Sequence, residues 1–249
     1  MSKSVRLNKA LADAGLCSRR KADELIGSGV VLVNGQKAET GMKIDPEKDV
    51  VSVRGQRLAL ATSADVPLYL MLNKPVQIVS TAKDPEGRTT VLDLLPKVYT
   101  DKRLYPVGRL DYFSEGLLLL CNDGELTQRL THPRYHVPRV YEVRLRQRPG
   151  SEALMAMRSG MRLAEGEKLA PVEVEALDSS GDGALLRMTL HQGVNRQIRR
   201  MCRDLALTIL VLRRVALGPL TLGDLGKGLC RPLDANELVA LKKAVGLVS

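Results

Sequence analysis

The segment GRLDYFSEGLLLL, residues 108–120, constrains the fold of this chain more than any other segment does. Asp111 lies shortly before an unbroken apolar run, Leu117 to Leu120, which we expect to enter a core as a strand or a helix. A carboxylate at the edge of a core is costly unless another group pairs with it. The sequence therefore predicts a partner for Asp111, or else a structural role for it as the cap of a turn or helix.

Charge and composition narrow the class of protein. The chain of 249 residues is long enough for one or two domains, and with no Trp and a single Phe its core must be aliphatic. A net charge of +10 indicates a polyanionic partner, nucleic acid first and an anionic membrane second. No apolar run approaches the roughly 20 residues of a membrane span, and the first 15 residues lack the apolar block of a signal peptide. We therefore expect a cytoplasmic protein that is not bound to a membrane.

Cysteine and histidine spacing indicates neither a metal site nor a disulfide framework. The four cysteines include no CxxC pair, and the three histidines lack the spacing of metal ligands. A zinc-dependent base deaminase would need HxE and PCxxC motifs, and the sequence contains neither. We expect no bound metal.

Residues 1–62 are predicted to form a small separate domain. Apolar residues recur at helical spacing in two pieces, with a break at Gly15 and Ser18 as the N-cap of the second helix. Asn34-Gly35 predicts a hairpin turn, and DVVSVRGQRL, residues 49–58, predicts a second strand–turn–strand. The short polar stretch 61–67 is typical of a linker.

Residues 67–249 are predicted to form an α+β domain with a largely antiparallel sheet flanked by helices. The alternation of side chains favours strands, and two segments favour helices instead. Strands outnumber helices and do not follow a regular βαβ rhythm. The expected strands are at 68–75, 141–145 and 184–193, and the expected helices at 126–133 and 194–207.

The first domain resembles the S4-like RNA-binding module over roughly residues 5–53. The resemblance rests on RLNKALADAGLCSRRKADELIGSGVVLVNG, residues 6–35. A helix pair with basic side chains and helix N-terminal N–H groups can follow a phosphate backbone, although a basic helix face can also simply be solvated. The resemblance implies RNA binding by Arg6, Lys9, Arg19, Arg20 and Lys21.

Four segments of the second domain, in this order, resemble the bacterial ribosomal-RNA pseudouridine synthases that carry an N-terminal S4-like module. They are LNKPVQIVST, GRLDYFSEGLLLLCNDGEL, VYEVRL and HQGVNRQIRRMC. The resemblance covers nearly the whole chain. It implies a monomeric enzyme that isomerises uridine to pseudouridine without a cofactor, in 23S rather than 16S ribosomal RNA, presented as RNA or as a ribosome-assembly intermediate. One departure is Gln77, where the family usually has Gly, and it bears on the local backbone.

The same resemblance assigns the catalytic residues. Asp111 would act on C1′ of the sugar, on the base, or on a sugar proton, and the sequence leaves these three open. Tyr141 would stack on the extruded base or take part in proton transfer, although a tyrosine in an alternating strand is usually a packing residue. Arg199 would pair with Asp111. Helical spacing alone does not choose between Arg196 and Arg199, because the two are neighbours on one face.

The remaining expected contacts concern substrate binding. Leu212 would pack beneath the active-site ring, and Arg109 would act as a wedge in the RNA stack or as a phosphate anchor. Arg196 and Arg200 would face RNA phosphate, and Lys74 is also assigned to substrate binding. The alternative from another class is a non-catalytic RNA-binding ribosome-assembly factor on the same fold. Such a protein would tolerate loss of the Asp, Tyr and Arg set, and all three are present.

Overall fold

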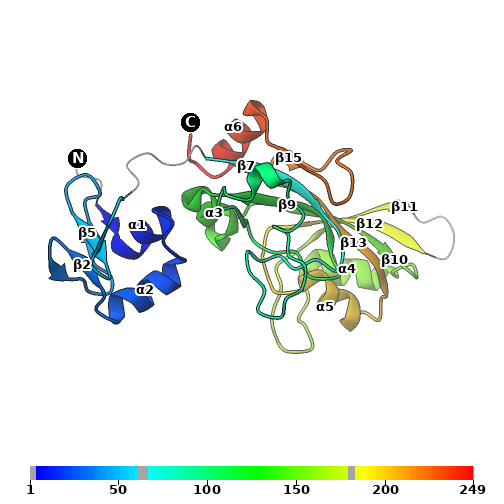
Figure 1. Ribbon diagram of the computed structural model, residues 1–249. Coiled ribbons are helices and arrows are strands. Elements are labelled where there is room, and N and C mark those ends of the chain that lie inside the picture. The colour runs from blue at the N-terminus through cyan, green and yellow to red at the C-terminus, as the bar shows by residue number, and fades with distance from the viewer. Residues whose placement is uncertain (1–3, 61–66, 179–182, 249) are drawn as a thin grey trace. The chain divides into compact units, whose positions relative to one another are not determined.

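The computed structural model describes residues 4–60, 67–178 and 183–248. The chain divides into two compact units, Met1–Val66 and Pro67–Ser249, and each has hydrophobic clusters of its own (Figure 1). The linker predicted at 61–67 falls almost entirely on residues outside the described part of the chain. Among the described residues, no helix combines the length and the apolar character needed to cross a membrane.

The first unit packs two short helices against small strands. Its strands form a four-stranded antiparallel sheet in the order β3-β2-β5-β6 and a separate pair, β1-β4. Leu7, Leu11, Ile26 and Val31 are among the aliphatic residues of its core. The elements are β1 (Val5–Arg6), α1 (Leu7–Asp13), α2 (Arg19–Gly27), β2 (Val31–Val33), β3 (Gln36–Lys37), β4 (Lys43–Ile44), β5 (Val51–Val53) and β6 (Gln56–Leu58).

Local sequence signals explain the elements of this unit. The Ser18 side chain accepts a hydrogen bond from the backbone N–H of Lys21 at 3.2 Å, which confirms the predicted N-cap of α2. Asn34 and Gly35 have φ values of 52° and 83°, as the tight turn between β2 and β3 requires. The second predicted hairpin is also confirmed, because Arg54 and Gly55 adopt the same left-handed conformation between β5 and β6.

The second unit is built on a nine-stranded sheet with the strand order β11-β12-β10-β13-β9-β7-β15, and β14 and β8 pair with β13 and β9. All of its strand pairs are antiparallel except β13 with β9, which confirms the predicted α+β class. Its strands are β7 (Tyr69–Lys74), β8 (Tyr105–Pro106), β9 (Glu115–Cys121), β10 (Arg139–Leu145), β11 (Glu173–Asp178), β12 (Ala184–Leu190), β13 (Ile209–Leu217), β14 (Leu220–Thr221) and β15 (Cys230–Pro232).

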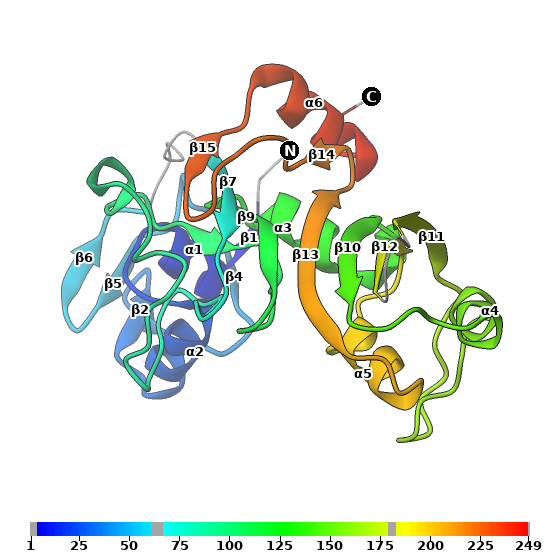
Figure 2. The same ribbon diagram turned by 90° about the vertical axis from the view of Figure 1, so that its right-hand side faces the viewer.

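Helices cover different parts of this sheet. Buried residues of α3 (Gly124–Thr131) and α6 (Ala235–Ala244) pack with β7 and β9, whereas those of α4 (Ser151–Ser159) and α5 (Gln197–Asp204) pack with β10, β12 and β13. Figure 2 shows α3 and α6 close to β7, β9 and β14, and α4 and α5 nearer the β10–β12 end. Two short 3-10 helices, η1 (Lys97–Tyr99) and η2 (Pro133–Tyr135), lie in loops.

The apolar run after Asp111 is a strand buried on both faces. Leu117 and Leu119 of β9 belong to the cluster that includes α3 and α6, and Leu118 and Leu120 pack with Leu110 and other residues of the opposite face. Because both faces are covered, the strand reads as a continuous apolar run rather than an alternating one. Asp111 therefore lies shortly before a strand whose residues Leu117 to Leu120 have no exposed surface.

The expected helix over 194–207 is shorter in the structure. It begins at Gln197, because Arg196 has φ of 50° and lies outside it as the N-cap residue, and it ends at Asp204. Arg196 therefore lies outside the helix and does not share a helical face with Arg199. The left-handed turn at Arg196 redirects the chain just before α5.

Candidate active site

The loop that carries Asp111 is fixed by its backbone. The side chain of Lys74 is fully buried, and its ammonium donates hydrogen bonds to the carbonyl oxygens of Pro75 at 2.8 Å, Asp111 at 3.2 Å and Ser114 at 2.8 Å. The Ser114 N–H also donates to the carbonyl of Asp111 at 2.9 Å and closes a turn. Burial lowers the pKa of Lys74 to about 8, although the nearby Asp111 and Glu115 oppose that shift.

Lys74 therefore needs a different role from the predicted one. A side chain with no exposed surface cannot contact RNA, so its assignment to substrate binding is corrected. Its three carbonyl acceptors come from the end of β7 and from both ends of the Asp111–Ser114 turn. Lys74 thus joins the Lys-Pro segment to the Asp111 loop.

The structure brings Arg199 to Asp111. Arg199 Nε lies 3.6 Å from Asp111 Oδ2, and Arg199 Nη2 donates to the carbonyl of Phe113 at 2.8 Å and to Ser114 Oγ at 3.1 Å. The two charged side chains are only 19% and 29% exposed. Burial lowers the pKa of Arg199, and the charge of Asp111 opposes that shift. The carboxylate thus has a cationic partner and keeps access to a ligand.

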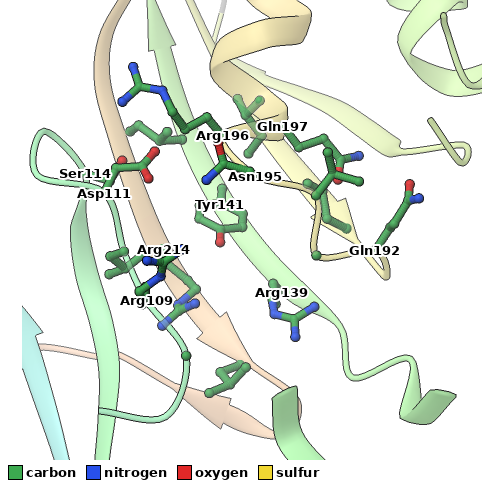
Figure 3. A pocket seen from close by; sticks show the side chains of 18 of the residues that line it. Arg109, Asp111, Ser114, Arg139, Tyr141, Gln192, Asn195, Arg196, Gln197 and Arg214 are labelled. Carbon is green, nitrogen blue, oxygen red and sulfur yellow. The ribbon is translucent and has the colours of Figure 1, made fainter. Parts of the chain in front are cut away.

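Tyr141 and Leu212 lie on neighbouring strands beside this pair. Tyr141 of β10 is directly opposite Arg214 of β13, and Leu212 is opposite Val143, so side chains two residues apart fall on one face. Both Tyr141 and Leu212 line the same pocket as Asp111. Figure 3 shows Tyr141 in the centre of the pocket with Asp111 to one side of it.

The pocket has a volume of about 230 Å³ and a basic lining. Its charged side chains are one carboxylate and five guanidinium groups, with Leu110, Leu212 and Ile198 among the apolar residues. Among the described residues, no three His, Cys, Asp or Glu side chains lie close enough together to hold a metal ion. The charged lining residues are Asp111, Arg109, Arg139, Arg196, Arg199 and Arg214.

Two of these arginines, Arg139 and Arg214, were not among the expected site residues. Arg139 precedes Tyr141 by two residues on β10, and Arg214 follows Leu212 by two residues on β13. The period of two in a strand would have placed each of them on the face of its active-site neighbour.

Gly116 lets β13 approach β9 closely enough to bring Arg214 to the site. A Cβ atom at Gly116, whose φ is 102°, would lie 2.2 Å from the carbonyl oxygen of Arg214. Only glycine allows these two backbones to cross at that distance. The parallel contact of β9 with β13 therefore depends on this one residue.

Arg200 does not line this pocket. Its guanidinium pairs with Glu167 at 2.8 Å and with Glu165 at 3.2 Å, on the loop that follows α4. Two carboxylates therefore already compensate the charge that the sequence analysis assigned to RNA phosphate. Arg109 and Arg196 do line the pocket.

The five basic residues predicted to bind RNA in the first unit are all exposed. Lys9 pairs with Asp13 at 3.2 Å and Lys21 with Glu24 at 2.6 Å. Arg6, Arg19 and Arg20 form no ion pair with any described residue. These three arginines are therefore the ones whose charge is most available to a ligand.

Comparison with known proteins defines the class of this fold and site. The model of the RNA pseudouridylate synthase family matches residues 68–204, and the S4 domain model matches residues 5–51. The chain belongs to the RNA pseudouridylate synthase family and is an enzyme of that class. The resemblance inferred from the sequence is thereby confirmed, including the S4-like module.

Individual relatives align with nearly the whole chain. An RNA pseudouridine synthase of Aquifex aeolicus is 39% identical, and the alignment covers 98% of this chain and 96% of that protein. Ribosomal large subunit pseudouridine synthase B of Bacillus subtilis is 38% identical, with 95% of each chain covered. The dual-specificity RNA pseudouridine synthase RluF of Escherichia coli is 37% identical over 97% of this chain and 80% of its own. A crystal structure of a pseudouridylate synthase superposes with a TM-score of 0.67 at 28% identity, covering 95% of this chain and 99% of that one.

Proposed function

We propose that this enzyme converts a defined uridine of ribosomal RNA to pseudouridine, in 23S rather than 16S RNA, and that it acts on the RNA or on a ribosome-assembly intermediate. The observation that carries the proposal is the Asp111–Arg199 pair beside Tyr141 in a basic pocket. The preference for 23S RNA is supported by relatives named for the large ribosomal subunit, at 38% and 37% identity.

The reaction is an isomerisation, so no atom is gained or lost. The bond from uracil N1 to C1′ of the ribose breaks, the base turns, and C5 bonds to C1′. The proton on C5 leaves, and N1 gains one. Asp111 is the group we propose for the first step, by attack on C1′, by attack on the base or by removal of a sugar proton. Arg199 pairs with the carboxylate and holds it in position while RNA excludes water.

Tyr141 and Leu212 would hold the detached base while it turns. The Tyr141 ring offers a stacking face, and its hydroxyl offers a group for moving the C5 proton. Leu212 supplies an apolar support that makes no hydrogen bond to the base and so permits rotation. Arg109 and Arg196 would contact RNA outside the reacting base, with Arg109 as a wedge or phosphate anchor and Arg196 at phosphate.

The test is the Asp111→Asn variant, which keeps the size of the side chain and removes its charge. We expect it to fold and to bind ribosomal RNA like the wild type, and to make no pseudouridine in a tritium-release assay on uridine-labelled 23S and 16S RNA. The free energy of unfolding should change by about 1 kcal/mol, because the site is partly open to solvent. Turnover like that of the wild type would overturn the role proposed for Asp111, whereas a wild type that makes no pseudouridine in either RNA would leave the RNA-binding assembly factor as the better function. If the wild type releases tritium from 16S RNA and not from 23S RNA, the proposed preference for 23S RNA is overturned.

A further inference from the structure

The charges of the pocket do not balance. Asp111 is paired with Arg199, and the pocket then still holds four guanidinium groups. None of these four makes an ion pair with a carboxylate of the described residues. Cations gathered in a partly buried pocket are costly unless a counter-charge joins them. The four are Arg109, Arg139, Arg196 and Arg214.

Arg214 is a buried guanidinium of this pocket whose charge is not compensated. It is only 2% exposed, and its Nε donates to the carbonyl of Leu117 at 2.7 Å. Its Nη2 is buried and has no hydrogen-bond partner in the described part of the chain, although the residue lines the pocket. A buried charged N–H without an acceptor costs more than a neutral one, so its presence at the pocket wall points to a ligand that supplies the acceptor.

Arg139 reinforces the same side of the pocket. It donates Nη2 to the carbonyl of Leu130 at 3.2 Å and lies two residues before Tyr141 on β10. Burial lowers its pKa, the nearby Tyr141 opposes that shift, and the positive charge of Arg214 lowers it further. The positive charges of Arg139 and Arg214 therefore repel each other. In Figure 3 Arg109, Arg139 and Arg214 lie on the side toward which the Tyr141 hydroxyl points.

We propose that Arg139 and Arg214, with Arg109 beside them, form an anion subsite that takes a phosphodiester group next to the ribose of the target uridine. This subsite rests on the proposed function, which brings that nucleotide into the pocket. A planar guanidinium fork matches the oxygens of a phosphate, and the phosphate would meet the free Nη2 of Arg214. The subsite holds the backbone still while Asp111 works on the sugar or base.

Inorganic phosphate is the first probe, and the full chain is used without RNA. Phosphate should raise the melting temperature of the wild type, relative to chloride at equal ionic strength, by about 3–6 °C at ten times its Kd. Arg214→Met and Arg139→Gln should abolish that rise. Arg200→Gln is the matched control, because Arg200 is already paired with Glu165 and Glu167, and it should keep the rise.

A neutral linkage is the second probe. A short single-stranded RNA with one uridine is compared with versions that carry a methylphosphonate 5′ or 3′ of that uridine. For the wild type, one of the two versions should bind about 10- to 140-fold more weakly than the native RNA. For Arg214→Met, native and modified RNA should bind alike. If Arg214→Met does not fold, Arg139→Gln answers the same question.

Opposite results would overturn the subsite. A purely structural Arg214 predicts that Arg214→Met melts at a lower temperature and that methylphosphonate costs the same affinity in variant and wild type. An equal phosphate effect in wild type and both variants would also overturn it. Neither probe needs turnover. A wild type that binds phosphate as described and makes no pseudouridine would overturn the proposed function alone, whereas an active enzyme without these effects would overturn the subsite alone.

Discussion

Lys74 contacts Asp111 through the backbone, with its ammonium 3.2 Å from the Asp111 carbonyl oxygen, while the carboxylate of Asp111 faces Arg199 at 3.6 Å. One cation thus fixes the position of the loop, and another compensates the charge that the loop presents. The division explains how a carboxylate can be held firmly at the edge of a core and still be open to a substrate.

Lys74→Met should show the linkage between this buried ammonium and folding. The pKa of Lys74 is about 8 in the folded protein, below the ordinary lysine value near 10.5. Between these values the unfolded chain binds more protons, so the contribution of Lys74 to stability rises with pH from about 8 to 10.5. The free energy of unfolding of the wild type minus that of Lys74→Met should increase over this range by on the order of 3 kcal/mol.

Urea denaturation at pH 7, 8.5 and 10 measures this difference, and the other titrating groups cancel between the two proteins. A difference that stays flat or falls across these pH values would mean that Lys74 keeps an ordinary pKa. At pH 7 the variant should also lose turnover more than RNA affinity, because two carbonyl groups of the loop and that of Pro75 lose their donor.

Tyr141→Phe separates the two roles proposed for this ring. Phenylalanine keeps the stacking face and removes the hydroxyl. If the hydroxyl moves a proton, kcat should fall by about 100-fold or more while the Kd for RNA stays within about twofold. If only stacking matters, the variant should turn over nearly like the wild type. A large loss of affinity would contradict both roles, and single-turnover kinetics with a binding titration measures both quantities.

Arg200→Gln should affect stability and leave RNA binding unchanged. Arg200 joins α5 to Glu165 and Glu167, and its side chain is only 18% exposed. Loss of these ion pairs should lower the free energy of unfolding only slightly, because solvent screens them. The affinity for ribosomal RNA and its dependence on salt should match the wild type. A clear drop in the salt dependence would return Arg200 to the RNA-contacting residues.

The double variant Arg19→Ala, Arg20→Ala should weaken RNA binding and leave the free energy of unfolding unchanged. Both side chains are exposed at the start of α2 and form no ion pair with the described part of the chain. If each contacts one phosphate of a duplex, the slope of log affinity against log salt should become shallower by about 1.8. Replacing Lys37 and Lys48, exposed residues of the same unit, removes two charges elsewhere and should leave the slope as it is. An unchanged slope in the arginine variant would show that these residues do not contact phosphate.

The fold was predictable wherever a local signal was enough. The cap at Ser18 and the Asn34-Gly35 turn depend on a few adjacent residues, and both formed as expected. The apolar run 117–120 left helix and strand open, because a buried run carries no period. In the structure, segments distant in sequence cover both faces of this run, and the run is a strand.

Long-range contacts account for what the sequence did not predict. No residue near Arg200 in the sequence indicates that Glu165 and Glu167 pair with it. No residue near Lys74 indicates that its ammonium donates to carbonyl groups 37 and 40 residues away. Gln77 departs from the glycine of the resembling family, yet it has φ of 62° and donates to the carbonyl of Tyr112 at 2.6 Å. The backbone conformation is thus present without the residue that adopts it most easily.

The close crossing of β9 and β13 at Gly116 also determines when the enzyme can become active during its synthesis. Arg199 follows Phe113, which it contacts, by 86 residues, and Arg214 follows its acceptor Leu117 by 97. On a chain still on the ribosome, Asp111 lacks Arg199 until α5 has emerged, and the Leu117 carbonyl lacks Arg214 until β13 has emerged and has packed beside β9. The first unit precedes all of these residues in the chain, so its elements are synthesised before those that complete the active site.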